Sequence, residues 1–401
     1  MTEWKRNLLI MWFVQFAGMF AISAVFAFIP LYVRHLGIEQ WDQVSLWSGL
    51  LASSSAIFAA ISSPLWGNMA DRYGRRIMVI RVMLANTFIL STMGFVANVW
   101  QLLGLRILQG IFGGFGGAVM ALVTTLTPPD KLGTTLGLMQ AALIAGSAAG
   151  PLAGGIIADH WGFRAVFFIL GAMSFTAGLA AVLIREQFQP PAKEKSPSFG
   201  GNIRQMCKEP GLLPLIFVLF LIQFAVAVPS PVLPLFVEQL GASPDDLATI
   251  AGGIIAIAGL SSALSAASTG RITHFFSHRT VLLSAAACAA VIIFIQGLAQ
   301  STGQLFWLRF LNGLFLGSML PTANTLISLL IPAERRGAAF GLTHSATLLG
   351  NVLGPVTGGL LASFFNIRWV FFFTAFFYVA NCIWIYHRVR RRHDPPAAGQ
   401  H

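Results

Sequence analysis

Long apolar runs separated by short polar segments set the pattern of this chain. Each run comes close to the roughly 20 residues that a membrane-spanning helix needs. Barrel strands would be about ten residues long with strict polar and apolar alternation, which these runs lack. The pattern predicts an all-α integral membrane protein with twelve transmembrane helices. They lie near residues 8–33, 45–66, 77–96, 100–126, 133–157, 164–184, 212–235, 247–269, 280–299, 304–330, 337–362 and 368–387.

The composition points the same way. Of the 401 residues, 56% are hydrophobic and only 10% are charged, whereas a soluble domain has about 25% charged residues. The first run follows Trp4, Lys5 and Arg6, like the start of a signal peptide. We interpret it as a retained helix, because the second half of the chain contains a counterpart of it.

The two halves repeat each other at an offset of about 204 residues. "LRILQG" (105–110) recurs as "LRFLNG" (308–313), and "GSAAGPLAGG" (146–155) recurs as "GNVLGPVTGG" (350–359). An even number of helices per copy gives both copies the same direction through the membrane, as in a parallel repeat. The repeat therefore predicts two six-helix bundles around a central cavity.

A polar, Pro- and Gly-rich segment lies between the sixth and seventh runs, and it is typical of a linker. The expected organisation follows from it. Residues 1–184 form an N-terminal six-helix bundle, 185–211 a cytoplasmic linker, 212–387 a C-terminal six-helix bundle, and 388–401 a cytoplasmic basic tail.

The net charge of +11 is compatible with nucleic-acid binding, but the positions of the charges favour another explanation. Most of the 25 lysines and arginines fall in segments on one side of the predicted membrane. The loops on the other side hold only Arg34, Arg164 and Arg368. This asymmetry follows the positive-inside rule and predicts that both termini are cytoplasmic. The basic excess would meet anionic membrane lipid, so we expect no nucleic-acid partner.

Motifs for catalysis and cofactors are missing from the sequence. Cys207, Cys288 and Cys382 are scattered without metal-ligand spacing. No G-x-x-x-x-G-K-[ST] loop and no nucleophile constellation occurs. We therefore expect no enzyme activity, no cofactor and no metal.

The loop between the second and third predicted helices reads "GNMADRYGRR" (67–76). Its glycines allow a tight turn and close helix approach. Its lone acid could pair with an arginine or cap a helix N-terminus. The residues concerned are Gly67, Asp71, Arg72, Gly74, Arg75 and Arg76. In the second copy, "GRITHFFSHR" (270–279), His274 replaces the acid. We therefore expect pairing or capping by this acid in the first half only.

Glycines at a spacing of four mark the fifth and eleventh predicted helices. Small residues at this spacing form one stripe and let helices approach closely in lipid, and the prolines bend each helix. The first copy contains Gly146, Gly150, Pro151, Gly154 and Gly155. The second contains Gly350, Gly354, Pro355, Gly358 and Gly359.

Arg106 belongs to the fourth predicted helix. At about 1.5 Å per residue it lies about 9 Å into the membrane, where an arginine costs a few kcal/mol unless it is solvated or paired. We expect it to face a cavity or polar groups, with Gln109 on the adjacent turn. The alternative is a snorkelling or packing arginine. Arg309 is its copy in the second half.

Three of these segments resemble one family. "GNMADRYGRR" is similar to the signature of the major facilitator superfamily, and "LRILQG" resembles its helix-four motif. "GSAAGPLAGG" resembles the helix-five motif of the twelve-helix drug:proton antiporter branch. The resemblance implies the major facilitator fold, a monomer, and a cytoplasmic latch at 67–76 between the two halves. It also implies a role for Arg106 in proton coupling or substrate binding, and export rather than import.

The acids raise a difficulty for proton coupling, because all of them fall outside the helix centres. Three explanations stay open. His344 could titrate, since imidazole changes charge near neutral pH, although a lone histidine in a membrane helix is more often a hydrogen-bonded structural group. A loop acid such as Asp71 or Asp130 could titrate instead. Finally, the substrate could carry the coupling, with Arg106 attracting anions.

A cavity without acids has nothing to neutralise a cation, which favours neutral, zwitterionic or anionic substrates. Its candidate lining is Gln15, Phe16, Met19, Gln140, Gln223, Asn312, Asn324 and His344. The prediction is a secondary transporter in a bacterial-type plasma membrane that exports small amphiphilic compounds by proton antiport with alternating access. The alternatives are an exporter or importer of one metabolite, such as a sugar, lipid or organic anion, and a non-transporting membrane sensor.

Overall fold

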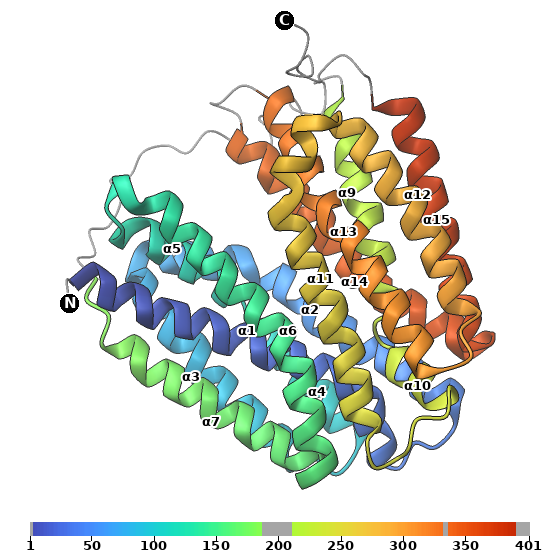
Figure 1. Ribbon diagram of the computed structural model, residues 1–401. Coiled ribbons are helices and arrows are strands. Elements are labelled where there is room, and N and C mark those ends of the chain that lie inside the picture. The colour runs from blue at the N-terminus through green and yellow to red at the C-terminus, as the bar shows by residue number, and fades with distance from the viewer. Residues whose placement is uncertain (1–2, 187–210, 332–335, 390–401) are drawn as a thin grey trace, which may run out of the picture. The chain divides into compact units, whose positions relative to one another are not determined.

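The computed structural model describes residues 3–186, 211–331 and 336–389 (Figure 1). Most of the predicted linker and of the basic tail lies outside these residues. The side chain of Asp71 is also outside the description, although its backbone belongs to a helix.

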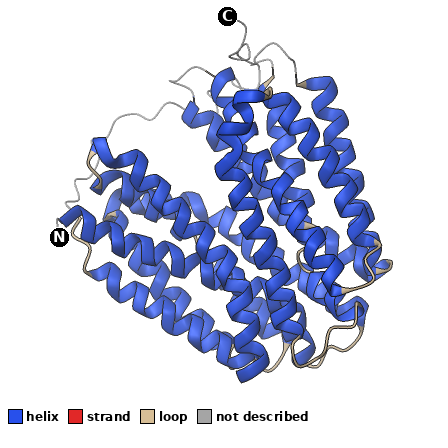
Figure 2. Ribbon diagram, viewed as in Figure 1, coloured by secondary structure: helices blue, strands red, loops and turns tan. Residues whose placement is uncertain are grey.

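The described residues form helices joined by loops and turns, and none of these residues forms a strand (Figure 2). Within this described part of the chain, ten helices are long and apolar enough to cross a membrane. In the first half these are α1 (Glu3–His35), α2 (Trp41–Tyr73), α3 (Arg75–Met93), α6 (Leu132–Trp161) and α7 (Phe163–Val182). In the second half they are α11 (Leu247–Phe275), α12 (His278–Gly297), α13 (Thr302–Leu330), α14 (Arg336–Phe364) and α15 (Ile367–Arg388).

Two of the twelve predicted spans are each divided into two shorter helices. The expectation of one helix over 100–126 is wrong, because α4 (Val99–Ile111) ends before α5 (Phe115–Leu126) begins. Gly114 between them has a φ of 91°, which interrupts the helix and is accessible to glycine at little cost.

The second division falls within the run predicted at 212–235. Here α9 (Leu212–Ala227) ends, a turn follows, and α10 (Leu233–Gln239) begins. Pro229 and Pro231 lie in the turn. Since proline has no N–H to donate to the helix ladder, two of them so close together end the helix.

The chain divides into two compact units. One contains residues 1–194 and 242–256, and the other contains 195–241 and 257–401. The first unit thus includes the opening turns of α11. Its core joins α1, α3, α5, α6 and α7 through buried apolar side chains, among them Met11, Val14, Val79, Met83, Val119, Leu122, Met139 and Ala177.

Each unit uses the same helix pairings at equivalent places of the repeat. In the first unit α1 packs along α6, and α3 packs along α7. In the second, α9 packs along α14, and α12 packs along α15. The repetition seen in the sequence therefore extends to the packing inside each unit.

Candidate functional site

Arg106 on α4 is 1% exposed, and the chain itself surrounds it. Its Nε donates to the Leu51 carbonyl of α2 at 3.1 Å, and its Nη1 donates to the Gln109 amide oxygen at 2.6 Å. The guanidinium carbon lies 5.0 Å from the centre of the Phe26 ring on α1. Neutral dipoles and a ring face thus solvate the cation, and none of these partners is a carboxylate.

One guanidinium donor of Arg106 is left over, because Nη2 is buried without a partner among the described residues. A buried unmatched donor on a cation is costly in a low-dielectric interior. An anion, a water molecule or a substrate acceptor reaching this atom would relieve that cost. Arg106 therefore has a donor that can bind an acceptor.

The interruption of the helix between α4 and α5 leaves backbone carbonyls without helical partners. Side chains of α2 and α3 donate hydrogen bonds to them. Trp66 donates its ring N–H to the Ile111 carbonyl at 2.6 Å, and Arg81 donates to Phe112 and Gly113 at 3.3 and 3.2 Å. Arg81 also stacks over Trp66, with 3.3 Å between its guanidinium carbon and the ring centre. From the sequence, Arg81 counted only as a charge that orients the chain. The overlooked signal was the Gly113–Gly114 pair, which predicts a break with carbonyls to satisfy.

The glycine stripe of α6 lies against α1. A Cβ on Gly146 would come within 2.6 Å of the Phe16 carbonyl oxygen, and one on Gly150 would come within 2.5 Å of the Phe20 carbonyl oxygen. A Cβ on Gly154 would contact Ala24 at 3.1 Å. Only glycine permits this approach, because backbone atoms of α1 obstruct a Cβ at both Gly146 and Gly150, and the Ser23 hydroxyl also obstructs one at Gly150.

Gly155 and Pro151 instead bring α6 against the first turns of α11, inside the same unit. A Cβ on Gly155 would collide with the Ala248 carbonyl, and one on Gly252 would collide with the Pro151 carbonyl. The motif therefore serves two contacts, one to α1 and one to α11. In the second unit the matching stripe packs on α9. Its contacts join Gly350 to Phe224, Gly354 to Ala227 and Gly358 to Val228, and Pro355 and Gly359 lie in the same helix.

Asp159, in the last turn of α6, caps the N-terminus of α11. Its two carboxylate oxygens accept hydrogen bonds from the backbone N–H groups of Ala248 at 3.2 Å and Thr249 at 2.7 Å. These are the second and third residues of α11, whose N–H groups have no partner within the helix. Sequence reasoning did not single out this residue. The helix dipole disfavours a negative charge at the C-terminal end of a helix, where Asp159 lies. An acid at this place could have indicated a stabilising partner on another helix.

The predicted latch loop is organised around an acid that sequence reasoning also missed. Glu186 accepts from the backbone N–H of Arg75 at 3.1 Å and of Arg76 at 2.8 Å, and so caps α3. Arg76 also donates to the Val182 carbonyl, and Arg75 donates to the Thr125 hydroxyl.

The two glycines of this loop have different environments. Gly74 has a φ of 98° and separates α2 from α3 as expected. The expectation that Gly67 shapes the turn is wrong, because it lies inside α2, and a methyl group added to it would have no neighbour within 4 Å. Arg72 lies over the ring of Tyr73, 5.3 Å from its centre.

The predicted cavity residues do not share one environment. Gln15 and Asn312 are 1% and 2% exposed and lie within the packing of their bundles, each with an amide atom that has no partner among the described residues. Gln223 donates to Asn351 at 2.8 Å, whereas Gln140 and His344 are exposed. Of the remaining candidates, Phe16 stacks on Trp12 with centroids 5.6 Å apart, and Met19 and Asn324 are half-buried.

The second unit also buries polar groups around Arg309. Its Nε and Nη2 have no partner among the described residues, and it lies near Tyr378 of α15. Tyr378 is fully buried, as is Asn381 one turn further on, and neither side chain has a hydrogen-bond partner in the described part of the chain. The sequence pointed to Arg309 but to neither of its α15 neighbours.

Comparison with known proteins places this geometry in a family. The model of the Major Facilitator Superfamily matches residues 11–295 and 215–401. The chain belongs to this superfamily, and its fold and family support a secondary transporter rather than an enzyme.

Two relatives match over nearly their whole length. Multidrug resistance protein MdtG of Escherichia fergusonii is 35% identical over 402 residues, covering 99% of this chain and 98% of that protein. The protein of the same name from Rahnella sp. is 36% identical over 392 residues, covering 97% and 95%.

Solved structures share the fold at low identity. A D-xylose-proton symporter has a TM-score of 0.76 at 17% identity, with 100% of both chains covered. A bacterial homologue of the human lysosomal transporter Spinster, in an inward-facing and unoccupied conformation, has a TM-score of 0.79 at 16% identity, with 96% of both chains covered. Identities this low show the fold alone.

Proposed function

We propose that this chain exports small amphiphilic compounds of several kinds by proton antiport with alternating access. The observation that carries the proposal is the full-length likeness to multidrug resistance proteins at 35–36% identity. The glycine motif of α6 supports it, because Gly146, Gly150, Gly154 and Gly155 each meet a close neighbour on another helix.

Alternating access needs contacts that form and break during each cycle. Candidates are the predicted latch at Asp71 and the cap that Asp159 places on α11. The interruption between α4 and α5 is a second candidate for a segment that moves. Its backbone carbonyls accept hydrogen bonds from the side chains of Trp66 and Arg81 instead of from a continuous helix.

The substrate preference follows from Arg106. Its buried cation has a free donor and no carboxylate among its partners, so a neutral, zwitterionic or anionic compound is attracted more than a cation is. The proton carrier stays open among His344, a loop acid, and coupling through the substrate. We further propose a monomer in a bacterial plasma membrane with both termini in the cytoplasm.

The decisive experiment uses everted membrane vesicles from an efflux-deficient host that expresses the chain. A respiratory substrate acidifies the interior of the everted vesicles. A pH-sensitive dye reports the partial collapse of this pH difference when a transported compound is added. Antiport predicts collapse with several unrelated compounds and their accumulation in the vesicles. Vesicles with Asp71→Asn protein at equal membrane levels provide the comparison and should show reduced flux.

The alternatives give different results in the same vesicles. Flux of a single metabolite, with no response to other compounds, would replace the proposal with a dedicated exporter or importer. Accumulation that ignores the proton gradient would overturn antiport. Equal flux in the Asp71→Asn vesicles would remove the latch from the mechanism, and no flux for any compound would favour the sensor.

A further inference from the structure

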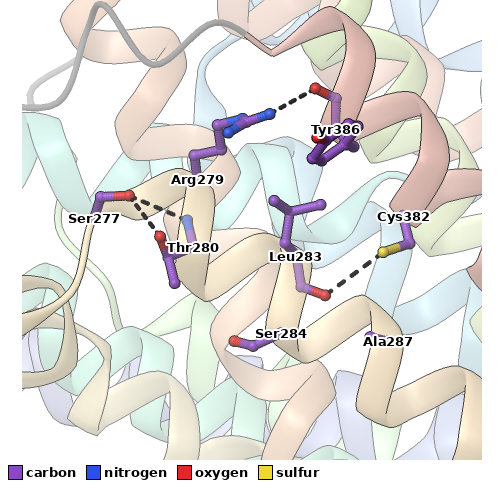
Figure 3. A pocket seen from close by; sticks show the side chains of 8 residues that line it. All are labelled: Ser277, Arg279, Thr280, Leu283, Ser284, Ala287, Cys382 and Tyr386. Carbon is purple, nitrogen blue, oxygen red and sulfur yellow. Dashed lines mark hydrogen bonds between the residues drawn. The ribbon is translucent and has the colours of Figure 1, made fainter.

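A crevice opens between α12 and α15 of the second unit, with a volume of about 750 Å³ (Figure 3). One end is polar and contains Ser277, Arg279 and Thr280, from the start of α12. The other end contains Leu283, Ser284 and Ala287 of α12, and the Ser284 hydroxyl donates to the Val281 carbonyl at 3.1 Å, which leaves this end mainly apolar. Between Arg279 and Ala287 the helix rises roughly 12 Å. The crevice is therefore amphipathic along the axis of a membrane-spanning helix.

Arg279 is the cationic group of this crevice, and α15 holds it in place. It donates through Nη2 to the Tyr386 carbonyl, and its guanidinium carbon lies 5.4 Å from the centre of the Tyr386 ring. Its Nε is buried and has no partner among the described residues. Figure 3 shows the side chain reaching from α12 toward Tyr386 across the polar end. A guanidinium held in place in this way is suited to a phosphate.

The first unit shows what an anion does at the equivalent place. There Glu186 accepts from the first two N–H groups of α3, and Arg76 donates to the Val182 carbonyl. At the repeat offset of 204, Tyr386 corresponds to Val182 and Arg390 corresponds to Glu186. Arg390 lies outside the described residues. The second copy thus has an arginine at the position where the first has the capping acid.

The sequence around this position reinforces the difference. Residues 386–393 read "YHRVRRRH" and contain no acid. At the first turn of α12 the Ser277 hydroxyl accepts a hydrogen bond from the Thr280 backbone N–H at 3.2 Å. An anion supplied from outside the protein would therefore complete the arrangement that Glu186 completes in the first unit.

We propose that this crevice is a binding site for an anionic phospholipid. The phosphate binds Arg279 and the one hydroxyl of the Ser277–Thr280 pair whose proton is not used in the 2.9 Å hydrogen bond between them, and an acyl chain lies along Leu283 and Ala287. Lipid is the occupant because the crevice belongs to a membrane-spanning helix pair and continues into an apolar wall, which a free phosphate would leave empty. Charge complementarity selects an anionic headgroup, since basic residues near a membrane surface attract anionic lipid.

Cys382 gives the crevice a built-in reporter, because it lies in the wall and is half-buried. In a Cys207→Ser, Cys288→Ser background it is the one remaining cysteine. The purified protein is placed in lipid nanodiscs of phosphatidylethanolamine, with or without phosphatidylglycerol, and the rate of maleimide labelling is measured. We expect phosphatidylglycerol to slow labelling about fivefold. Arg279→Gln should abolish this protection, and Arg279→Lys should keep part of it.

The controls separate the sources of protection. Arg271→Gln removes the same charge from an exposed position of α11 and should leave protection intact. Inorganic phosphate added to phosphatidylethanolamine nanodiscs should not protect. Equal protection in the Arg279→Gln protein, protection by phosphate alone, or no protection by phosphatidylglycerol would each overturn the proposal. Labelling does not depend on transport, so its outcome is independent of the proposed function.

Discussion

Arg106 illustrates how much of the chemistry rests on single residues. The planar guanidinium of Arg106 donates to the Leu51 carbonyl and to the Gln109 amide oxygen at the same time. Lysine is a point charge on a flexible stem and cannot reproduce both bonds. The charge and the fork can therefore be tested separately at this position.

We expect Arg106→Ala to lower export of anionic compounds about tenfold while export of lipophilic cations is unchanged or higher. The reason is electrostatic, because the substitution removes the only cation among the described groups that surround this site. Vesicle uptake of one anionic and one cationic fluorescent compound measures both. Arg164→Ala, at an exposed position near the start of α7, is the matched loss of charge. A parallel fall for both compounds would assign Arg106 a packing role instead.

Glycine-to-alanine substitutions on α6 can distinguish two effects on stability: the loss of close helix packing and the gain in helix propensity. Gly150→Ala places a methyl group within 2.5 Å of the Phe20 carbonyl oxygen, whereas Gly137 on the same helix has nothing within 4 Å. Overpacking costs about 1–3 kcal/mol, and replacing glycine by alanine in a helix gains up to about 1 kcal/mol.

Gly150→Ala should therefore lower the thermal stability of the detergent-solubilised protein, and Gly137→Ala should leave it unchanged or raised. The fraction of monodisperse protein that survives heating measures this. Equal stability of the two variants would show that the α1–α6 contact relaxes without cost.

At the scale of elements, Asp159 shows how a side chain on one helix fixes the start of another. We expect Asp159→Ala to speed hydrogen exchange at the Ala248 and Thr249 amides about tenfold. A lost N-cap costs about 1 kcal/mol, and up to about 2 kcal/mol. Mass spectrometry of peptides from the start of α11 measures the exchange. Glu39→Ala, at an exposed acid of a loop, should change nothing there, and equal exchange in both variants would argue against the cap.

The helices and their interruptions differ in how well the sequence predicts them. Apolar runs of spanning length identify the helices, because a segment of this length that crosses lipid can satisfy its N–H and C=O groups within itself only as a helix. The breaks at Gly114 and around Pro229 were predictable from residue type, yet the apolar pattern continues through both.

Asp159 and Glu186 could not be paired with their partners from the sequence. Each bonds to backbone N–H groups of a segment about 90 to 110 residues away, and no residue type marks those partners. Their positions depend on tertiary packing. Arg106 was placed near Gln109 because both belong to one helix, where spacing alone determines which side chains meet.

At the scale of the molecule, the two copies share packing but differ in acidic residues. Asp71 corresponds to His274, Asp159 to Ser363, and Glu186 to Arg390. In each pair only the first copy has the acid. Duplication thus supplies two similar bundles, while the acids at these three places are confined to the first. The second copy correspondingly carries the stronger basic charge at its end, in residues 386–393.

This charge distribution makes a prediction about orientation that involves the whole chain. A fluorescent protein fused after residue 401 should fluoresce, and alkaline phosphatase fused there should be inactive, because both termini are expected in the cytoplasm. Phosphatase fused after Glu39 or after Asn366, in loops of the opposite side, should be active. Colony colour and whole-cell fluorescence measure these outcomes at matched expression. An active phosphatase at the C-terminus would reverse the orientation and place the latch loop, and the basic end of the lipid crevice, on the outer face.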